Sequence, residues 1–291
     1  MTVETVASAR RRRLRRGIVI LPSAFTLGNL FLGVWAIVEA TRGAYATAGW
    51  LIVAAGVMDM FDGRIARVTA TGTPFGEELD SLVDAVSFGV APALIVYLAF
   101  FRDGEWGWLI SFGYITAAIL RLARFNIEQA GTAKANFHGL PSPSAGGCVA
   151  TFWAFSHTPF WNTWFAGVNL TRAAGWLVLG AGVLMVSNVL YPVMPRFSLR
   201  SWGGRLAVLL AFAAITAALT VPEYFFFPFA IIYIAYGLIR TVVEGFEERL
   251  SDDEPMELSE REEDQARELD YEEIRPGTSR YPARPTDRET T

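Results

Sequence analysis

Long apolar stretches alternate with short polar segments from residue 18 to residue 243. Several stretches run for about 18 to 22 residues, the length of an α-helix that crosses ~30 Å of hydrocarbon. The predicted helices cover residues 18–41, 45–66, 76–101, 106–125, 143–161, 173–194, 204–221 and 223–243. The pattern predicts an all-α, polytopic integral membrane helical bundle.

The last two stretches leave the number of transmembrane helices open. Only the segment VPEYFF separates them, and Pro222 can start a new helix or kink a re-entrant hairpin. We therefore predict six to eight transmembrane helices and prefer eight.

Charge is concentrated at the two ends of this 291-residue chain, of which 52% is hydrophobic. Residues 10–16 read RRRRLRR, whereas residues 251–291 hold 14 acidic residues against 6 Arg. The formal net charge of −4 averages these opposite ends. We predict a basic cytoplasmic segment at 1–17, a transmembrane catalytic domain at 18–243 and an acidic, largely disordered cytoplasmic tail at 244–291.

The positive-inside rule gives an orientation. With eight spans, one side of the membrane collects 15 Lys and Arg residues and the other side collects Arg42, Arg102 and Arg172. The richer side holds both termini, which predicts that the termini are cytoplasmic in a protein of the plasma membrane. We expect membrane lipids but no nucleic acid as partners.

Four aspartates lie at the predicted cytoplasmic ends of the second and third helices. Asp59 and Asp62 are three residues apart, and Asp80 and Asp84 are four apart, so each pair shares one face of its helix. The segment between the helices, VTATGTP, is short and contains Gly72 and Pro74, which favour a turn. We therefore expect the two helices to be antiparallel neighbours. The four carboxylates are therefore predicted to converge.

Converging carboxylates in a low dielectric need a positive partner. Oxygen ligands without Cys or His suit Mg²⁺ or Mn²⁺, and such ions commonly bind substrate phosphates as well. Two other interpretations are ion pairing with Arg64 and Arg67, or a divalent-cation transporter. The position at one end of the membrane favours chemistry over transport.

The spacing Asp59-x-x-Asp62-Gly63-x-x-Ala66-Arg67, then Gly76-x-x-x-Asp80-x-x-x-Asp84, resembles the signature of the CDP-alcohol phosphatidyltransferase family. The resemblance extends over about residues 20–240. It implies displacement of CMP from a CDP-activated lipid by an alcohol. It also implies that Asp59, Asp62, Asp80 and Asp84 hold two Mg²⁺ or Mn²⁺ ions, with Asp84 as general base. The expected CDP-lipid-binding residues are Gly63, Arg67, Thr73, Thr26 and Asn29.

Further segments resemble the phosphatidylserine synthase branch of this family. They are LPSAFTLGNLFLG, LDSLVDAVSFGVAPA, RLARFN, FHGLPSPSAGG and SNVLYP. This resemblance implies CDP-diacylglycerol and L-serine as substrates. Ser23 departs from the Asn that is common in relatives. Another acceptor of the same family, glycerol phosphate or inositol phosphate, is the alternative.

The acceptor needs donors for its carboxylate, and the fourth helix ends with Arg121, Arg124 and Asn126. Anchoring at the membrane surface is the competing interpretation of the arginines. His138 lies in the following cytoplasmic loop and completes the predicted acceptor-binding set. Dimerisation is common in the resembled family, so a homodimer is a further expectation.

Overall fold

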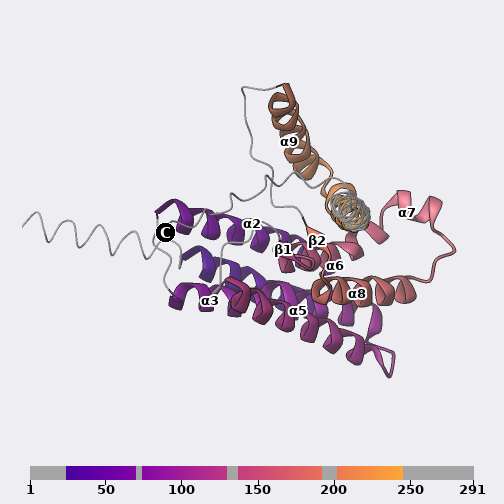
Figure 1. The fold of residues 1–291 in the computed structure, drawn as a ribbon. Helices are drawn as coiled ribbons and strands as arrows, with labels where there is room; N and C mark the ends of the chain where they lie inside the picture. Colours follow the sequence, from indigo (N-terminus) through magenta and orange to yellow (C-terminus); the bar gives the residue numbers. More distant parts are fainter. Residues whose placement is uncertain (1–23, 70–73, 130–136, 192–201, 245–291) are drawn as a thin grey trace, which may run out of the picture. The chain divides into compact units, whose positions relative to one another are not determined.

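This computed structural model describes residues 24–69, 74–129, 137–191 and 202–244. The described helices are Ala24–Thr41, α2 (Tyr45–Thr69), α3 (Pro74–Asp84), α4 (Ala91–Val96), α5 (Gly107–Gln129), α6 (Ser142–Ser156), α7 (Pro159–Trp164), α8 (Leu170–Val186), α9 (Trp202–Thr220) and Pro222–Glu244. The π-helical turn Ala85–Val90 joins α3 to α4, and a second π-helical turn, Tyr97–Phe101, continues α4, so that residues 74–101 form one continuous helical rod (Figure 1).

The prediction of an all-α polytopic membrane protein is confirmed. Among the described residues, four helices are long and apolar enough to cross a membrane: Ala24–Thr41, Phe75–Phe101, Gly107–Ile127 and Pro222–Glu244. Leu170–Val186 and Gly204–Thr220 are shorter apolar helices.

Two predicted helices are shorter in the structure than in the sequence pattern. α6 ends at Ser156 because Thr158 and Pro159 start the separate helix α7, where the Thr158 hydroxyl accepts a hydrogen bond from the Trp161 N–H (3.3 Å). α8 ends at Val186 rather than at residue 194. Leu190 and Tyr191, which the sequence pattern placed in this helix, form a strand instead.

That strand, β2 (Leu190–Tyr191), pairs antiparallel with β1 (Phe137–His138). The Gly139 N–H donates to the Val189 carbonyl (2.9 Å), and the Leu140 N–H donates to the Leu184 carbonyl (3.0 Å). Gly139 has a φ of 83°, a conformation that residues with a side chain rarely adopt. These bonds join the segment before α6 to the segment after α8.

Pro222 begins a helix of its own instead of kinking a longer one. At the end of α9 the Val221 N–H donates to the Ala217 carbonyl (2.9 Å). In the first turn of the next helix the Tyr224 N–H donates to the Val221 carbonyl (3.1 Å). Proline suits this first position because its missing N–H would have no helical partner there.

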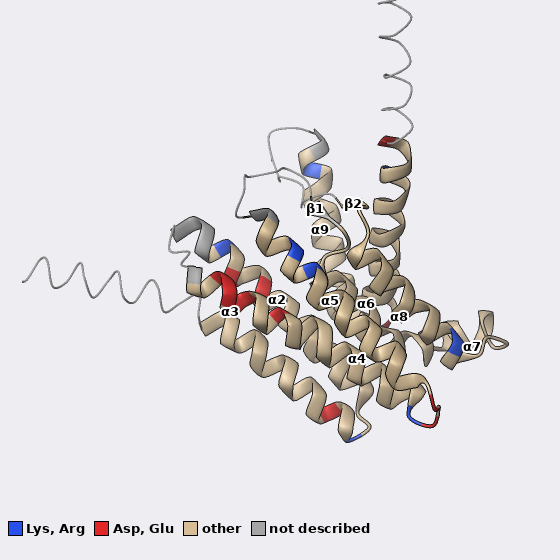
Figure 2. Cartoon of the chain, turned by 60° about the horizontal axis from the view of Figure 1, so that its bottom comes forward, with Lys and Arg blue, Asp and Glu red and all other residues tan. Residues whose placement is uncertain are grey.

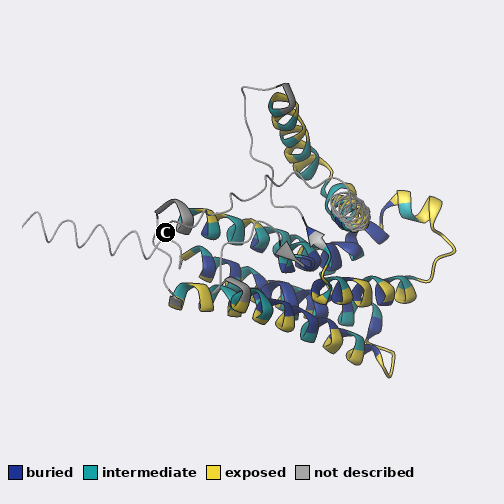
Figure 3. Ribbon diagram, viewed as in Figure 1, coloured by how far each residue is buried: buried dark blue, intermediate teal, exposed yellow. Residues whose placement is uncertain are grey.

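Figure 3 shows in dark blue the buried residues, whose hydrophobic members form two clusters. One joins residues of α4, α5, α6 and α8 with Tyr191, and the other joins the helix Ala24–Thr41, α2 and the rod around Phe88. Glycine permits close helix contact: a Cβ built on Gly49 of α2 would lie 2.6 Å from the Ala150 carbonyl oxygen of α6. Large apolar side chains such as Phe112 and Trp176 remain exposed, as expected on a surface that faces lipid.

The chain divides into two compact units, Met1–Ile239 and Arg240–Thr291. In the second unit the structure describes residues 240–244, in which the Arg240 Nε donates to Glu244 Oε1 (2.6 Å). The predicted basic segment at 1–17 and the tail from residue 245 onward lie outside the described residues.

Candidate metal centre and active site

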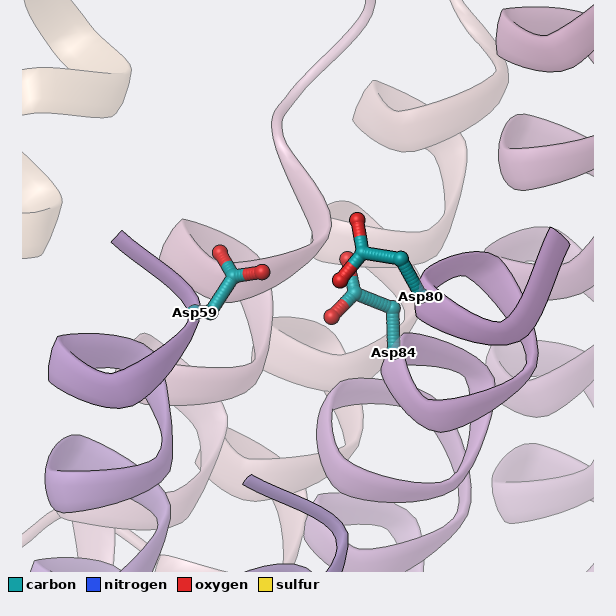
Figure 4. Close-up of side chains that lie close together, drawn as sticks. All are labelled: Asp59, Asp80 and Asp84. Carbon is teal, nitrogen blue, oxygen red and sulfur yellow. The ribbon is translucent and has the colours of Figure 1, made fainter. Parts of the chain in front are cut away.

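Three aspartates converge where α2 and α3 meet. Asp59 lies on α2, and Asp80 and Asp84 lie one turn apart on α3. One carboxylate oxygen from each lies within 4.8 Å of the other two. Figure 4 shows Asp80 and Asp84 side by side and Asp59 turned toward them. Acidic residues accordingly gather on adjoining parts of α2 and α3 (Figure 2).

The carboxylate donor set fits a divalent metal ion. Asp80 Oδ1 is buried and has no hydrogen-bond partner among the described residues. A buried carboxylate oxygen without a partner is costly, and a cation within reach of three carboxylates would remove that cost. Oxygen ligands without sulfur or imidazole suit Mg²⁺ or Mn²⁺. Three of the four aspartates that were predicted to converge therefore form a cluster that can hold a divalent metal.

Asp62 lies beside this cluster and has a different neighbour. Its side chain accepts a hydrogen bond from the Thr26 hydroxyl, and the residue is 6% exposed. It interacts electrostatically with Asp59 and Asp80. The three oxygens that lie closest together come from the other aspartates, so the role of Asp62 as a metal ligand stays a prediction.

Asn29 also contacts the aspartates. Its Nδ2 donates to Asp84 Oδ1 (3.3 Å), and Asn29 is fully buried. Thr26 and Asn29, which the sequence placed with the CDP-lipid, thus hydrogen-bond two of the four aspartates. Their contact with the lipid stays a prediction.

A π-helical turn directly follows Asp84 and is fixed from both sides. The Ser87 hydroxyl donates to the Asn29 carbonyl (3.2 Å), and the Tyr114 hydroxyl donates to the Phe88 carbonyl (3.0 Å). A Cβ on Gly146 would lie 3.0 Å from the Phe88 Cα, so the turn packs directly against α6. Sequence reasoning missed these supporting residues, although GNLFLG and SPSAGG carried the small residues that make room for the turn.

The remaining predicted CDP-lipid residues are less completely described. Gly63 follows Asp62 on α2 and is half-buried. Arg67 lies in the last turns of α2, but its side chain lies outside what the structure describes, as does Thr73 entirely. Their predicted roles stay untested.

Arg121 of α5 is a predicted acceptor residue that is buried and interacts electrostatically with the aspartate cluster. It is 9% exposed, its Nη1 donates to the Ser142 hydroxyl (2.7 Å), and its Cζ lies 5.2 Å from the centre of the Phe125 ring. Asp59 and Asp84 interact electrostatically with it. This burial does not fit an arginine that anchors a helix at the membrane surface.

The other predicted acceptor residues have structural contacts. Arg124 Nη2 donates to Asn188 Oδ1 (2.7 Å), which links α5 to the segment after α8. Asn126 Oδ1 accepts from the Ser81 hydroxyl (3.0 Å), which links α5 to α3. His138 lies in β1, and its side chain is outside the described part of the chain.

Comparison with known proteins agrees with this geometry. The family profile of the CDP-alcohol phosphatidyltransferases matches residues 19–186, which include all four aspartates. The chain is 35% identical over 232 residues to CDP-diacylglycerol–serine O-phosphatidyltransferase of Helicobacter pylori strain J99, covering 77% of this chain and 92% of that protein. It is also 35% identical over 220 residues to the protein of that name from Mycobacterium bovis, covering 72% and 73%.

A more distant similarity reaches the archaea. The chain is 31% identical over 176 residues to archaetidylserine synthase of Methanothermobacter thermautotrophicus, covering 60% of this chain and 70% of that protein. With the aspartate spacing, the converging carboxylates and the matched profile together, this chain belongs to the CDP-alcohol phosphatidyltransferase family.

Proposed function

We propose that this protein is a phosphatidylserine synthase that converts CDP-diacylglycerol and L-serine into phosphatidylserine and CMP. The observation that carries the proposal is a buried arginine, Arg121, within electrostatic range of the converging carboxylates of Asp59 and Asp84. An acceptor with a hydroxyl and a carboxylate fits this arrangement. The names of the similar bacterial proteins support the same reaction.

Asp84 acts as the general base in this proposal. It takes the proton of the serine hydroxyl, and the serine oxygen forms a bond to the lipid-proximal phosphorus as the bond from that phosphorus to the CMP oxygen breaks. CMP leaves with the electron pair of the broken bond. The Asn29 amide, which donates to Asp84 Oδ1, holds the carboxylate in one orientation.

Asp59, Asp62, Asp80 and Asp84 are the proposed ligands of two Mg²⁺ or Mn²⁺ ions. When bound, these ions neutralise the pyrophosphate and stabilise the charge on the leaving phosphate. Gly63 leaves space for the nucleotide beside Asp62, and Arg67, Thr73, Thr26 and Asn29 complete the proposed CDP-lipid site. Arg121 binds the serine carboxylate, and Arg124, Asn126 and His138 border that side.

The proposal includes a location. The 15-to-3 distribution of Lys and Arg supports an integral protein of the plasma membrane with both termini and the active site in the cytoplasm. We propose residues 18–243 as the catalytic domain, with surrounding lipids and a second copy of the chain as its partners. Family resemblance is the support for the homodimer.

Purified full-length protein in detergent tests the reaction. With CDP-diacylglycerol, labelled L-serine and Mg²⁺ or Mn²⁺, we expect release of CMP and labelled phosphatidylserine. Absence of metal-dependent CMP release with every alcohol would refute a transferase. Release with glycerol phosphate or inositol phosphate but not with serine would refute the proposed acceptor.

A further inference from the structure

Two tyrosines from the part of the chain that follows the family match pack against each other, and one of them interacts electrostatically with Arg121. Tyr191 ends β2, and Tyr233 lies in the helix Pro222–Glu244. Their ring centroids lie 5.4 Å apart with 30° between the ring planes. Tyr233 also packs against the apolar cluster that contains Tyr191 and Leu140, two residues before the Ser142 that Arg121 contacts, and it interacts electrostatically with Arg121. The family profile ends at residue 186, so neither tyrosine belongs to the matched region.

The ring of Tyr191 is held tightly from several directions. Its backbone pairs with Phe137 of β1, and its ring packs against Tyr233. A Cβ built on Gly237 would overlap the Tyr191 ring, so the absence of a side chain there makes room for it. Two other parts of the chain, β1 and the helix Pro222–Glu244, therefore position this residue.

The hydroxyl of Tyr191 is nevertheless left without a partner. The residue is 1% exposed, and its hydroxyl makes no hydrogen bond to any described residue. A buried polar group in this state costs about 1–3 kcal/mol of stability. Such a cost is understandable where a bound ligand completes the hydrogen bond.

The chemistry of that ligand follows from its neighbours. Arg121 offers only donors, and the two tyrosine hydroxyls can also donate, so the group suits an anion with more than one acceptor oxygen. We propose that Tyr191 and Tyr233, together with Arg121, form the subsite for the carboxylate of an amino-acid acceptor. This inference rests on the proposed function, because it places the acceptor's hydroxyl at Asp84 and its carboxylate at the tyrosines.

Such a subsite selects among alcohols. An acceptor without an anionic group leaves the buried donors unpaired, and a site built around specific hydrogen bonds discriminates strongly against substrates that cannot make them. The shared carboxylate cluster then supplies the transfer chemistry, while residues beyond 186 contribute to the choice of acceptor.

Tyr191→Phe and Tyr233→Phe test the subsite because each keeps its ring and removes one hydroxyl. We would measure CMP release by full-length protein against L-serine and, separately, against CDP-diacylglycerol. For each variant we expect KM for serine to rise about tenfold, because one hydrogen bond to a charged group is lost. KM for CDP-diacylglycerol should be unchanged. Tyr236→Phe is the matched control, since Tyr236 lies in the same helix and is 55% exposed.

A second readout separates binding of the carboxylate from packing. L-Serinamide keeps the hydroxyl and the amine of serine but lacks the carboxylate, so it should inhibit wild type and both variants equally. Wild-type KM for serine in both variants would overturn the inference and leave the proposed function intact. Equal rises in both KM values with a lowered Tm would show a packing role and also overturn it. Wild-type protein that fails to use serine would refute the proposed function itself, and the carboxylate assignment with it.

Discussion

The aspartate side and the arginine side of the site are built in different ways. Asp59, Asp80 and Asp84 come from two consecutive helices, at spacings that place them on facing stripes. The proposed arginine side comes from four elements: Arg121 from α5, Ser142 from α6, Tyr191 from β2 and Tyr233 from the helix Pro222–Glu244. The first side is a local motif that many members of a family can share. The second depends on how distant segments pack, so it can change while the first stays the same.

Removal of metal should have the largest effect, because it disables the aspartate side as a whole. We expect EDTA to stop CMP release completely and Mg²⁺ or Mn²⁺ to restore it. The measurement is the initial rate of CMP release before and after metal is added back. Full activity in EDTA-treated, metal-free protein would contradict the assignment of the cluster.

Replacing single aspartates should show which of them act in turnover and which in substrate binding. Asp84→Asn should lower kcat by about 10²–10⁴-fold, the usual contribution of a general base, yet leave CDP-diacylglycerol binding largely intact. Asp59→Asn should weaken both turnover and binding. Single-turnover CMP release and equilibrium binding of CDP-diacylglycerol measure the two effects.

Glu78→Gln provides the control for these changes, since Glu78 lies on α3 and is exposed. It removes one negative charge from the same helix and should retain wild-type activity. Substantial turnover by the Asp84 variant would show that another group takes the proton.

A change on the arginine side should act on one substrate only. Arg121→Lys keeps the charge but removes the planar set of donors that can hold a carboxylate. We expect kcat/KM for serine to fall by about 10- to 100-fold, because hydrogen bonds between charged groups are lost. KM for CDP-diacylglycerol should stay near the wild-type value. Arg172→Lys at the exposed start of α8 is the control. Similar losses for both substrates would make Arg121 part of a site common to the two.

The smallest effects should come from two neighbouring glycines of α6. A Cβ on Gly146 would meet the Phe88 backbone at 3.0 Å, whereas a Cβ on Gly147 would meet nothing within 4 Å. Gly146→Ala should therefore cost about 1–3 kcal/mol through overpacking. Gly147→Ala should be neutral or stabilising by about 0.5–1 kcal/mol. Thermal unfolding in detergent compares them, and equal Tm values would show that the contact between α6 and the rod is loose.

The contrast between the two sides also explains what the sequence could predict. Helix positions followed from apolar length, and the convergence of Asp59, Asp80 and Asp84 followed from helical spacing and a short connection. Tyr191 lies in SNVLYP, one of the segments that resemble the phosphatidylserine synthase branch, but nothing in the sequence paired it with Tyr233, which lies 42 positions later in an apolar helix. The sequence did not indicate the π-helical turn either, because AVSFGV has the composition of an ordinary transmembrane helix and the turn is held by contacts with distant residues such as Asn29, Tyr114 and Gly146.

The π-helical turn Ala85–Val90 also determines how the side chains of α3 are rotated about the helix axis relative to those of α4. A π-helical turn amounts to one extra residue within an α-helix, and one residue corresponds to about 100° of rotation. The segment that carries Asp80 and Asp84 is therefore out of phase with α4, which packs into the apolar interior. Deletion of a single residue between 85 and 90 would restore a regular helix and rotate the two carboxylates away from Asp59, although every aspartate would still be present.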